Sequence, residues 1–247
     1  IISMIIFVIF LVIIFIVYPI GKLFVSGFID DQNNYSLIIF LEKFTDKRIW
    51  SVPCFVDAGR CGVAINSLVM AIIVGALTTI LGLIFALLVT RTSLKFRRVI
   101  RAMSVLPIIT PPFVIGLAII LLFGLSGIVT TFVADILGVQ PTRWIYGLPG
   151  IIIAQTLAYT PIAFLVLIGV VESVSPSLEE AGQTLRANPY QVFNTISLPL
   201  MRPGIANAFL LGFIESMVDF GNPLVLGGNY DVLSTEIFFA IVGAQYH

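Results

Sequence analysis

The chain has 247 residues, of which 59% are hydrophobic and only 11% are charged, and its mean hydropathy is +1.10. Soluble domains usually carry about a quarter charged residues, so this composition excludes an ordinary soluble enzyme and indicates a chain embedded in lipid. The formal net charge is zero, which excludes the general basic excess that is typical of nucleic-acid binding.

Long apolar runs alternate with a few short charged stretches. A helix needs about 20 predominantly apolar residues to cross a bilayer. These runs are continuously apolar instead of alternating, so they predict helices and not the strands of a barrel. We expect one domain, 1–247, that is an all-α, polytopic transmembrane bundle. Five spans are predicted at 1–25, 63–90, 99–124, 148–171 and 203–220, with the start of a sixth near Glu236.

The two ends of the sequence lie inside apolar runs, and the first residue is not Met. We therefore expect a fragment of a longer polypeptide. A cleaved signal peptide is the alternative for the first run, but no positive residue precedes it, and 18–22 is a poor small-residue cleavage site. A retained first helix is the prediction that we carry forward.

The orientation follows from the loops. Segment 91–101 carries five basic residues and no acid, which predicts a cytoplasmic loop because basic residues accumulate on the inner side. The amino terminus and loop 172–202 are then cytoplasmic, and 26–62 is extracytoplasmic. Cys54 and Cys61 both lie in this outside loop, where a disulfide is plausible, with two free thiols as the alternative.

Loop 172–202 contains two predicted short helices. Ser177 with Glu180 has the spacing of a capping box, and 188–191, Asn-Pro-Tyr-Gln, has similar start signals. In the first helix, one face is formed by residues with helical spacing, namely Leu178, Ala181, Gly182 and Leu185. A helix lying in lipid headgroups usually carries Lys or Arg on its polar face, whereas this one is acidic. We therefore favour a docking surface for a partner protein. The small residues Ala181 and Gly182 would allow that partner to approach the helix closely.

The sequence from Glu180-Ala181-Gly182 through Ala187 to Leu198-Pro199 resembles the EAA loop of binding-protein-dependent, type I ABC importer permeases. In that family the loop forms a coupling helix that inserts into a groove of a cytoplasmic ATP-binding subunit. The resemblance implies that the residues contacting this subunit are Glu179, Glu180, Ala181, Gly182, Leu185, Arg186 and Ala187. Two residues depart from the pattern, because Gly182 replaces the usual second Ala and Arg186 the usual Gly. We expect these departures to alter the fit of the loop to its ATPase.

The resemblance also implies partners and a location. The chain would be a transport subunit without catalysis, in a bacterial inner membrane, that binds no cofactor while ATP and Mg²⁺ bind to the partner subunit. Its partners would be cytoplasmic ATP-binding subunits, a periplasmic binding protein and a second permease half, fused or separate. Segment 219–244 resembles the fused ferric iron subgroup, which implies iron as cargo, with phosphonate or sugar phosphate as alternatives. We expect no resident metal, since the single histidine is His247 and the acids are scattered.

Ionisable residues within a span are functional hypotheses. Glu215, Asp219 and Asn222 have the i, i+4, i+7 spacing of one helix face, and with Gln155 and Tyr159 they are candidates for a translocation path. The alternative is hydrogen bonding to neighbouring helices. Prolines are expected to interrupt the third span at 107, 111 and 112 and the fourth at 161.

Two other classes of protein were weighed. An intramembrane enzyme would need a nucleophile with a base, or paired metal ligands, and the spans contain neither set. An ion-driven carrier using Glu215 and Asp219 would have no need of a docking helix. No nucleotide-binding Gly-x-x-x-x-Gly-Lys motif occurs in the sequence.

Overall fold

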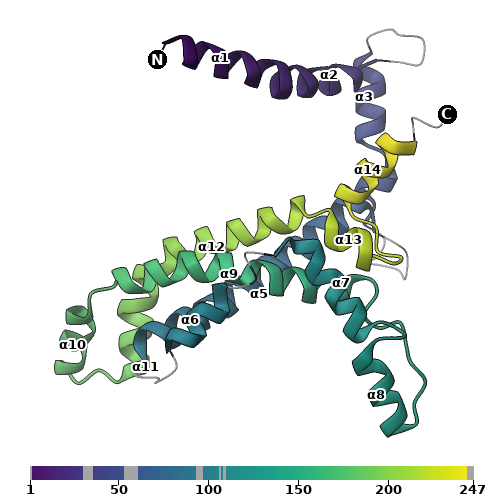
Figure 1. Ribbon diagram of the computed structural model, residues 1–247. Helices are drawn as coiled ribbons and strands as arrows, with labels where there is room; N and C mark the ends of the chain where they lie inside the picture. The colour runs from purple at the N-terminus through teal and green to yellow at the C-terminus, as the bar shows by residue number, and fades with distance from the viewer. Residues whose placement is uncertain are drawn as a thin grey trace. The chain divides into compact units, whose positions relative to one another are not determined.

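A computed structural model describes residues 2–29, 36–52, 61–92, 97–105, 107 and 110–243, and this described part consists of helices joined by turns and short loops (Figure 1). Five of its helical runs are long and apolar enough to cross a membrane. The predicted all-α polytopic class is therefore confirmed. Contacts divide the chain into two compact units, Ile1–Gly62 and Val63–His247, and each unit is described by itself.

The first unit begins with an apolar helical run, Ile2–Ser26, formed by α1 (Ile2–Val12), the π-helical segment η1 (Ile13–Val17) and α2 (Tyr18–Ser26). At about 1.5 Å per residue this run is long enough to span the hydrocarbon core, as predicted. Two short helices follow, α3 (Leu37–Phe44) and α4 (Lys47–Trp50). The indole of Trp50 donates to the carbonyl of Phe44 at 2.7 Å, and the two rings are in contact.

The second unit contains the other spans. Its elements are α5 (Val63–Arg91), α6 (Arg97–Val105), α7 (Pro112–Phe123), α8 (Ile128–Leu137), α9 (Leu148–Ser173), α10 (Pro176–Thr184), α11 (Pro189–Val192), the π-helical segment η4 (Phe193–Ser197), α12 (Leu198–Val218), α13 (Gly221–Leu226) and α14 (Leu233–Gly243). Helices α5, α9 and α12 lie side by side and pack against one another (Figure 1). Together they form the centre of this unit.

Glycines allow these three helices to approach closely. A Cβ on Gly212 of α12 would lie 3.4 Å from the Cα of Gly75 of α5 and only 2.5 Å from the Thr78 hydroxyl. A Cβ on Gly82 of α5 would lie 2.9 Å from the backbone nitrogen of Phe164 of α9. Small residues at such crossings are the usual means of packing helices in a membrane, where dispersion contacts take the place of the hydrophobic effect.

The third span differs from the prediction. Segment 99–124 is not one helix, because α6 ends at Val105 and α7 begins only at Pro112. Proline lacks an N–H, and it also disfavours helical geometry in the residue before it. Pro111, which precedes Pro112, accordingly has an extended ψ of 136°. The apolar run instead continues from Pro112 to Leu137 through α8, with a break at Gly124–Gly127 that the sequence analysis did not anticipate.

The expected effect of Pro161 and the bounds of the fifth span also differ from the prediction. Helix α9 continues through Pro161 without ending there, although an interruption was expected. Helix α12 starts at Leu198, before the predicted residue 203, and ends at Val218, before the predicted residue 220. Pro203 lies inside the continuous helical run Pro189–Val218, which therefore lacks one backbone N–H donor at this position. The earlier end at Val218 changes the geometry of the candidate path residues.

Candidate functional site

The segment that follows α9 begins with a sharp change of direction. Val174 ends α9 in an extended conformation, and α10 starts at Pro176 after Ser175. The predicted capping box at Ser177 and Glu180 is wrong, since the N-cap of α10 is Ser175 and the helix begins two residues earlier than that box requires. The hydroxyls of Ser175 and Ser177 are instead 2.7 Å apart.

A Schellman turn ends α10. The N–H of Arg186 donates to the carbonyl of Gln183 at 2.9 Å, and the N–H of Ala187 donates to the carbonyl of Gly182 at 3.2 Å. This motif requires a left-handed residue after the cap, usually glycine, and Arg186 takes that conformation with φ = 62°. The conformation gives a physical reason for the glycine that is usual at this position of the EAA loop.

The second short helix starts as predicted. The side chain of Asn188 accepts from the N–H of Gln191 at 2.8 Å, and the side chain of Gln191 accepts from the N–H of Asn188 at 3.0 Å. This reciprocal capping box at α11 is confirmed. Because α11 runs directly into η4 and α12, the cap fixes the start of a continuous helical run that becomes a spanning helix.

Gly182 faces its own chain and not a partner. It is buried, and a Cβ placed on it would lie 2.9 Å from Cδ1 of Ile196 and 3.2 Å from Cγ2 of Val192. The predicted single face of α10 is therefore divided. Gly182 packs against η4 and α11, whereas Leu178, Ala181 and Leu185 are exposed.

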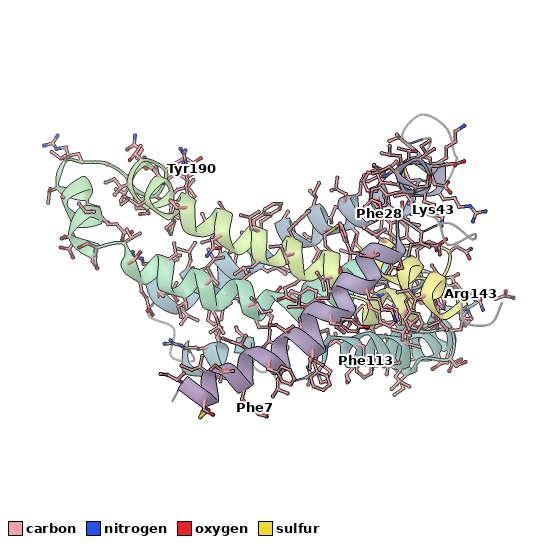
Figure 2. All side chains as sticks on the ribbon, turned by 90° about the horizontal axis from the view of Figure 1, so that it is seen from above. Phe7, Phe28, Lys43, Phe113, Arg143 and Tyr190 are labelled. Carbon is pink, nitrogen blue, oxygen red and sulfur yellow. The ribbon has the colours of Figure 1, made fainter. Side chains whose placement is uncertain are left out.

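The exposed part of this segment combines apolar side chains with charged side chains of both signs. Leu185 is 83% exposed and Tyr190 is 74% exposed, and Glu180 and Ala181 are also exposed. Figure 2 shows Tyr190 and Arg143 at opposite ends of the second unit. Large exposed apolar side chains at this end of the unit are accessible to a partner, which fits the predicted docking surface without testing it. We call the four residues Glu180, Ala181, Leu185 and Tyr190 the α10 surface.

Glu179 points back into the chain. Its Oε1 lies 3.1 Å from Nη2 of Arg91, and it accepts the hydroxyl of Ser197 at 2.7 Å. From the sequence, Glu179 was predicted to be a docking residue, and Arg91 was used only as one of the basic residues that indicate a cytoplasmic loop. An arginine at the end of a spanning helix was the available signal, but its partner becomes visible only once the helices are packed.

The candidate path residues separate into two groups. Helix α12 ends before Asp219, so Glu215, Asp219 and Asn222 do not share one helix face, and that expectation is wrong. Glu215 is exposed on α12, whereas Asp219 and Asn222 are buried beyond its end. The 219–222 turn, and not helical spacing, brings Asp219 and Asn222 together.

Asp219 accepts hydrogen bonds from two elements. Nε2 of Gln155 on α9 donates to its Oδ2 at 2.8 Å, and Nδ2 of Asn222 donates to the same oxygen at 2.7 Å. The backbone N–H groups of Gly221 and Asn222 donate to Oδ1 at 3.0 and 3.3 Å. The carboxylate thereby joins α9 to the beginning of α13.

Neighbouring groups extend this network. The Ser216 hydroxyl donates to Oε1 of Gln155 at 2.7 Å, and the Ser234 hydroxyl donates to the backbone carbonyl of Asp219 at 2.8 Å. The buried phenol of Tyr159 lies close to the same carboxylate. We call Gln155, Ser216, Asp219 and Asn222 the Asp219 network. Its buried hydrogen bonds fit the structural alternative for these residues, and Glu215 is the path candidate that remains exposed.

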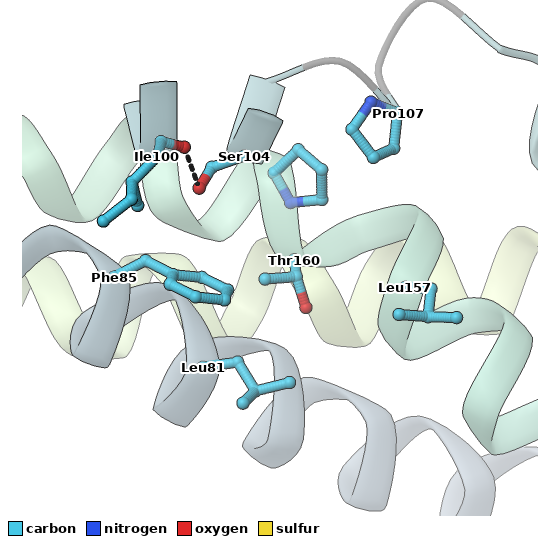
Figure 3. A pocket seen from close by; sticks show the side chains of 8 residues that line it. Leu81, Phe85, Ile100, Ser104, Pro107, Leu157 and Thr160 are labelled. Atoms are coloured by element: carbon cyan, nitrogen blue, oxygen red, sulfur yellow. Dashed lines mark hydrogen bonds between the residues drawn. The ribbon is translucent and has the colours of Figure 1, made fainter. Parts of the chain in front are cut away.

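A separate cavity lies among α5, α6 and α9. It has a volume of about 390 Å³ and a mainly apolar lining that includes Leu81, Phe85 and Leu157 (Figure 3). Ser104, at its edge, satisfies its hydroxyl by donating to the carbonyl of Ile100. Among the residues that the structure describes, those lining the cavity include none of the predicted site residues and no charged group.

Two further predictions concern cysteines and metals. Cys54 lies outside the described residues, so its disulfide with Cys61 stays a prediction. Within the described ranges, no group of three or more His, Cys, Asp or Glu residues could hold a metal ion. The absence of a resident metal and of a cofactor on this chain also stays a prediction.

Comparison with protein families matches residues 78–247 to the model of the binding-protein-dependent transport system inner membrane component. The ferric transport system permease protein of Actinobacillus pleuropneumoniae is 44% identical over 96% of this chain and 33% of its own length. The molybdenum transport system permease protein ModB of Azotobacter vinelandii is 30% identical over 69% of this chain and 78% of its own length. The chain thus spans about a third of the length of the ferric transport relatives that it matches.

Among solved structures, a bacterial ABC transporter involved in the import of the acidic polysaccharide alginate has the same fold. Its TM-score is 0.73 at 19% sequence identity, and the match covers 99% of this chain and 85% of the other. At this identity the likeness concerns the fold alone.

Proposed function

Because the chain belongs to the family of binding-protein-dependent transport system inner membrane components, we propose that it is part of the permease of an ABC importer for ferric iron. The observation that supports ferric iron as the cargo is the 44% identity to ferric transport permeases over 96% of the chain. The chain is a multi-pass inner membrane component, and its relatives are transport subunits and not enzymes.

The α10 surface would bind the ATP-binding subunit. Its apolar side chains protrude at one end of the second unit and lie beside an acidic residue, Glu180, which suits insertion into a groove that carries basic groups. This end would be cytoplasmic, since Arg91 lies there, 3.1 Å from Glu179 of α10. The opposite end and segment 26–62 would face the periplasmic binding protein, with the amino terminus in the cytoplasm.

Alternating access would then arise by movement of two permease halves, each with its own bundle. ATP and Mg²⁺ would bind to the partner subunits, whose closure moves α10. Glu215, exposed on α12, is the residue of this chain that could line the path between the two halves. No resident metal is needed on the permease, because the binding protein holds the ferric ion until delivery.

Uptake in proteoliposomes tests the cargo. The full-length permease, its ATP-binding subunit and the periplasmic binding protein are reconstituted, and radiolabelled ferric iron is supplied outside with ATP inside. We expect uptake that requires both ATP and the binding protein. ATP-dependent uptake of an oxyanion, a phosphonate or a sugar phosphate without iron uptake would contradict the cargo but retain the importer.

Because one relative is a molybdenum transport permease, molybdate is the first alternative cargo to include in that test. Molybdate and sulfate are therefore supplied in parallel, each with its own binding protein. Uptake driven by a proton or sodium gradient without ATP would instead favour the ion-driven carrier and contradict the importer.

A further inference from the structure

Arg91 is the last residue of α5, and its side chain reaches two other elements. The terminal nitrogen Nη2 lies 3.1 Å from Oε1 of Glu179 on α10. The same nitrogen donates to the backbone carbonyls of Val174 and Val171 at 3.1 and 3.3 Å. These carbonyls belong to the last turn and the cap of α9, where helix carbonyls lack partners and a cation is favoured by the helix dipole.

Glu179 adds a third spanning helix to this arrangement. Its Oε1 accepts the hydroxyl of Ser197 at 2.7 Å, and Ser197 is the last residue of η4, directly before α12. We call Arg91, Glu179 and Ser197 the Arg91 cluster. It connects α10 to the ends of α5, α9 and α12, which are the three helices at the centre of the unit.

The cluster is shielded from solvent only in part. The side chains of Arg91 and Glu179 are 28% and 21% exposed, and Ser197 is buried. A cavity of about 350 Å³ adjoins them, lined also by Gln183 and Met201. At such a site an ion pair is screened less than on the open surface. A guanidinium suits it because its planar array of donors can serve a carboxylate and carbonyls together.

The residues of this segment therefore perform two separable tasks. Glu180 and Leu185 point outward, on the α10 surface, whereas Glu179 points inward, to Arg91. An outward residue can bind a partner but cannot hold α10 to the bundle. The inward residues can hold α10 to the bundle without touching the partner.

We propose that Arg91 is a positioning residue that couples movement of α10 to the ends of α5, α9 and α12 through Glu179 and Ser197. The proposal rests on the proposed importer function. When the ATP-binding subunit moves α10, the ion pair and the two carbonyl bonds require the end of α9 and the start of α12 to follow. Without the cluster, the subunit still docks, but its movement no longer reaches the spanning helices.

The test uses the complete complex of permease, ATP-binding subunit and binding protein in lipid. Arg91→Met removes the cation, and Glu179→Gln keeps the shape of the side chain but removes its charge. Arg91→Lys keeps the positive charge but lacks the planar donor array of the guanidinium. Arg101→Met, an exposed arginine on α6, is the matched control. Two quantities are measured, namely co-purification of the ATP-binding subunit and the stimulation of ATP hydrolysis by loaded binding protein.

We expect Arg91→Met and Glu179→Gln to reduce the stimulation by about tenfold while the subunit co-purifies as in wild type. Arg91→Lys recovers part of the stimulation. The Arg91→Met, Glu179→Gln double variant is no worse than either single variant, because each single variant already breaks the ion pair between α5 and α10. Arg101→Met retains wild-type stimulation.

Other outcomes are equally decisive. Wild-type stimulation in both Arg91→Met and Glu179→Gln would overturn the proposal, as would loss of subunit binding, which would make the cluster part of the docking scaffold. If the Arg91→Met permease does not fold and cannot be purified, Glu179→Gln decides the question. If the wild-type complex shows no stimulation at all, the importer function itself fails, which is a different result from loss in the variants alone.

Discussion

The amide nitrogen of Gln155 donates to the carboxylate of Asp219 at 2.8 Å and thereby connects the middle of α9 to the residue that ends α12. The other three donors to this carboxylate are two backbone N–H groups and the side chain of Asn222. Because these four groups are all hydrogen-bond donors, the position of residue 219 suits a carboxylate, whose two oxygens both accept. These hydrogen bonds make Asp219 a residue that holds α9, α12 and α13 together.

Asp219→Asn is expected to destabilise the protein despite the similar size of the two side chains. Its NH₂ group would face donors at either oxygen position, and a buried donor without an acceptor costs about 1–3 kcal/mol. Asp219→Ala, which abandons all four donors, is expected to cost about 3 kcal/mol or more. Thermal unfolding in detergent measures both, with exposed Asp231→Ala as the control. An Asp219→Asn protein as stable as wild type would contradict this assignment.

Arg186→Gly is expected to stabilise the loop. Arg186 has φ = 62°, and a left-handed conformation costs a residue with a side chain about 1–2 kcal/mol relative to glycine. Arg186→Ala keeps that cost and is the matched control for loss of the charge. Rates of proteolysis between α10 and α11 report the local stability. Equal protection of the Gly and Ala variants would show that backbone strain is not the reason for the usual glycine.

Gly182 distinguishes small from branched substitutions. In Gly182→Ala the new Cβ meets Cδ1 of Ile196, the mobile end of a side chain, and a gain in helix propensity of about 1 kcal/mol offsets the adjustment. Gly182→Val adds two methyl groups against Val192 and Ile196, and overpacking of this kind costs about 1–3 kcal/mol. Thermal unfolding of the two variants, with exposed Ala181→Val as the control, should give this order. A Val variant as stable as the Ala variant would mean that α10 does not pack closely on η4.

Leu185 is expected to contribute to docking without contributing to stability. It is 83% exposed, so Leu185→Asp removes little packing in the free chain but places an unpaired charge in the proposed interface. Affinity for the ATP-binding subunit should fall by about tenfold or more, while the unfolding temperature stays constant. Val139→Asp, at another exposed apolar residue, is the control. An unchanged affinity would exclude the α10 surface as the docking site.

Features with a local signal in the sequence could be predicted. Apolar length predicted the first, second and fourth spans closely, and Asn188 with Gln191 predicted a capping box that the structure contains. Features that depend on packing could not be predicted. Pro161 was expected to interrupt the fourth span, but α9 continues through it. The third span was misplaced because three prolines lie between two apolar runs.

For the site residues too, local sequence signals were readable and the effects of packing were not. The loop around Glu180 was found from its motif, but the motif does not say which acid faces the partner. Glu179 and Gly182 face inward because α11 and η4 pack against α10, a contact that no spacing within α10 reveals. Asp219 was placed on a helix face because its spacing fits one, whereas the helix ends just before it.

ATP hydrolysis by the assembled complex in lipid is the most direct test of the central claim that α10 couples this bundle to an ATPase. The full-length permease with its ATP-binding subunit is measured with and without ferric-loaded binding protein, for wild type and for Glu180→Ala. The account predicts that loaded binding protein stimulates hydrolysis in wild type and that Glu180→Ala abolishes the stimulation. An ATP-binding subunit that neither binds the permease nor responds to the binding protein would contradict it.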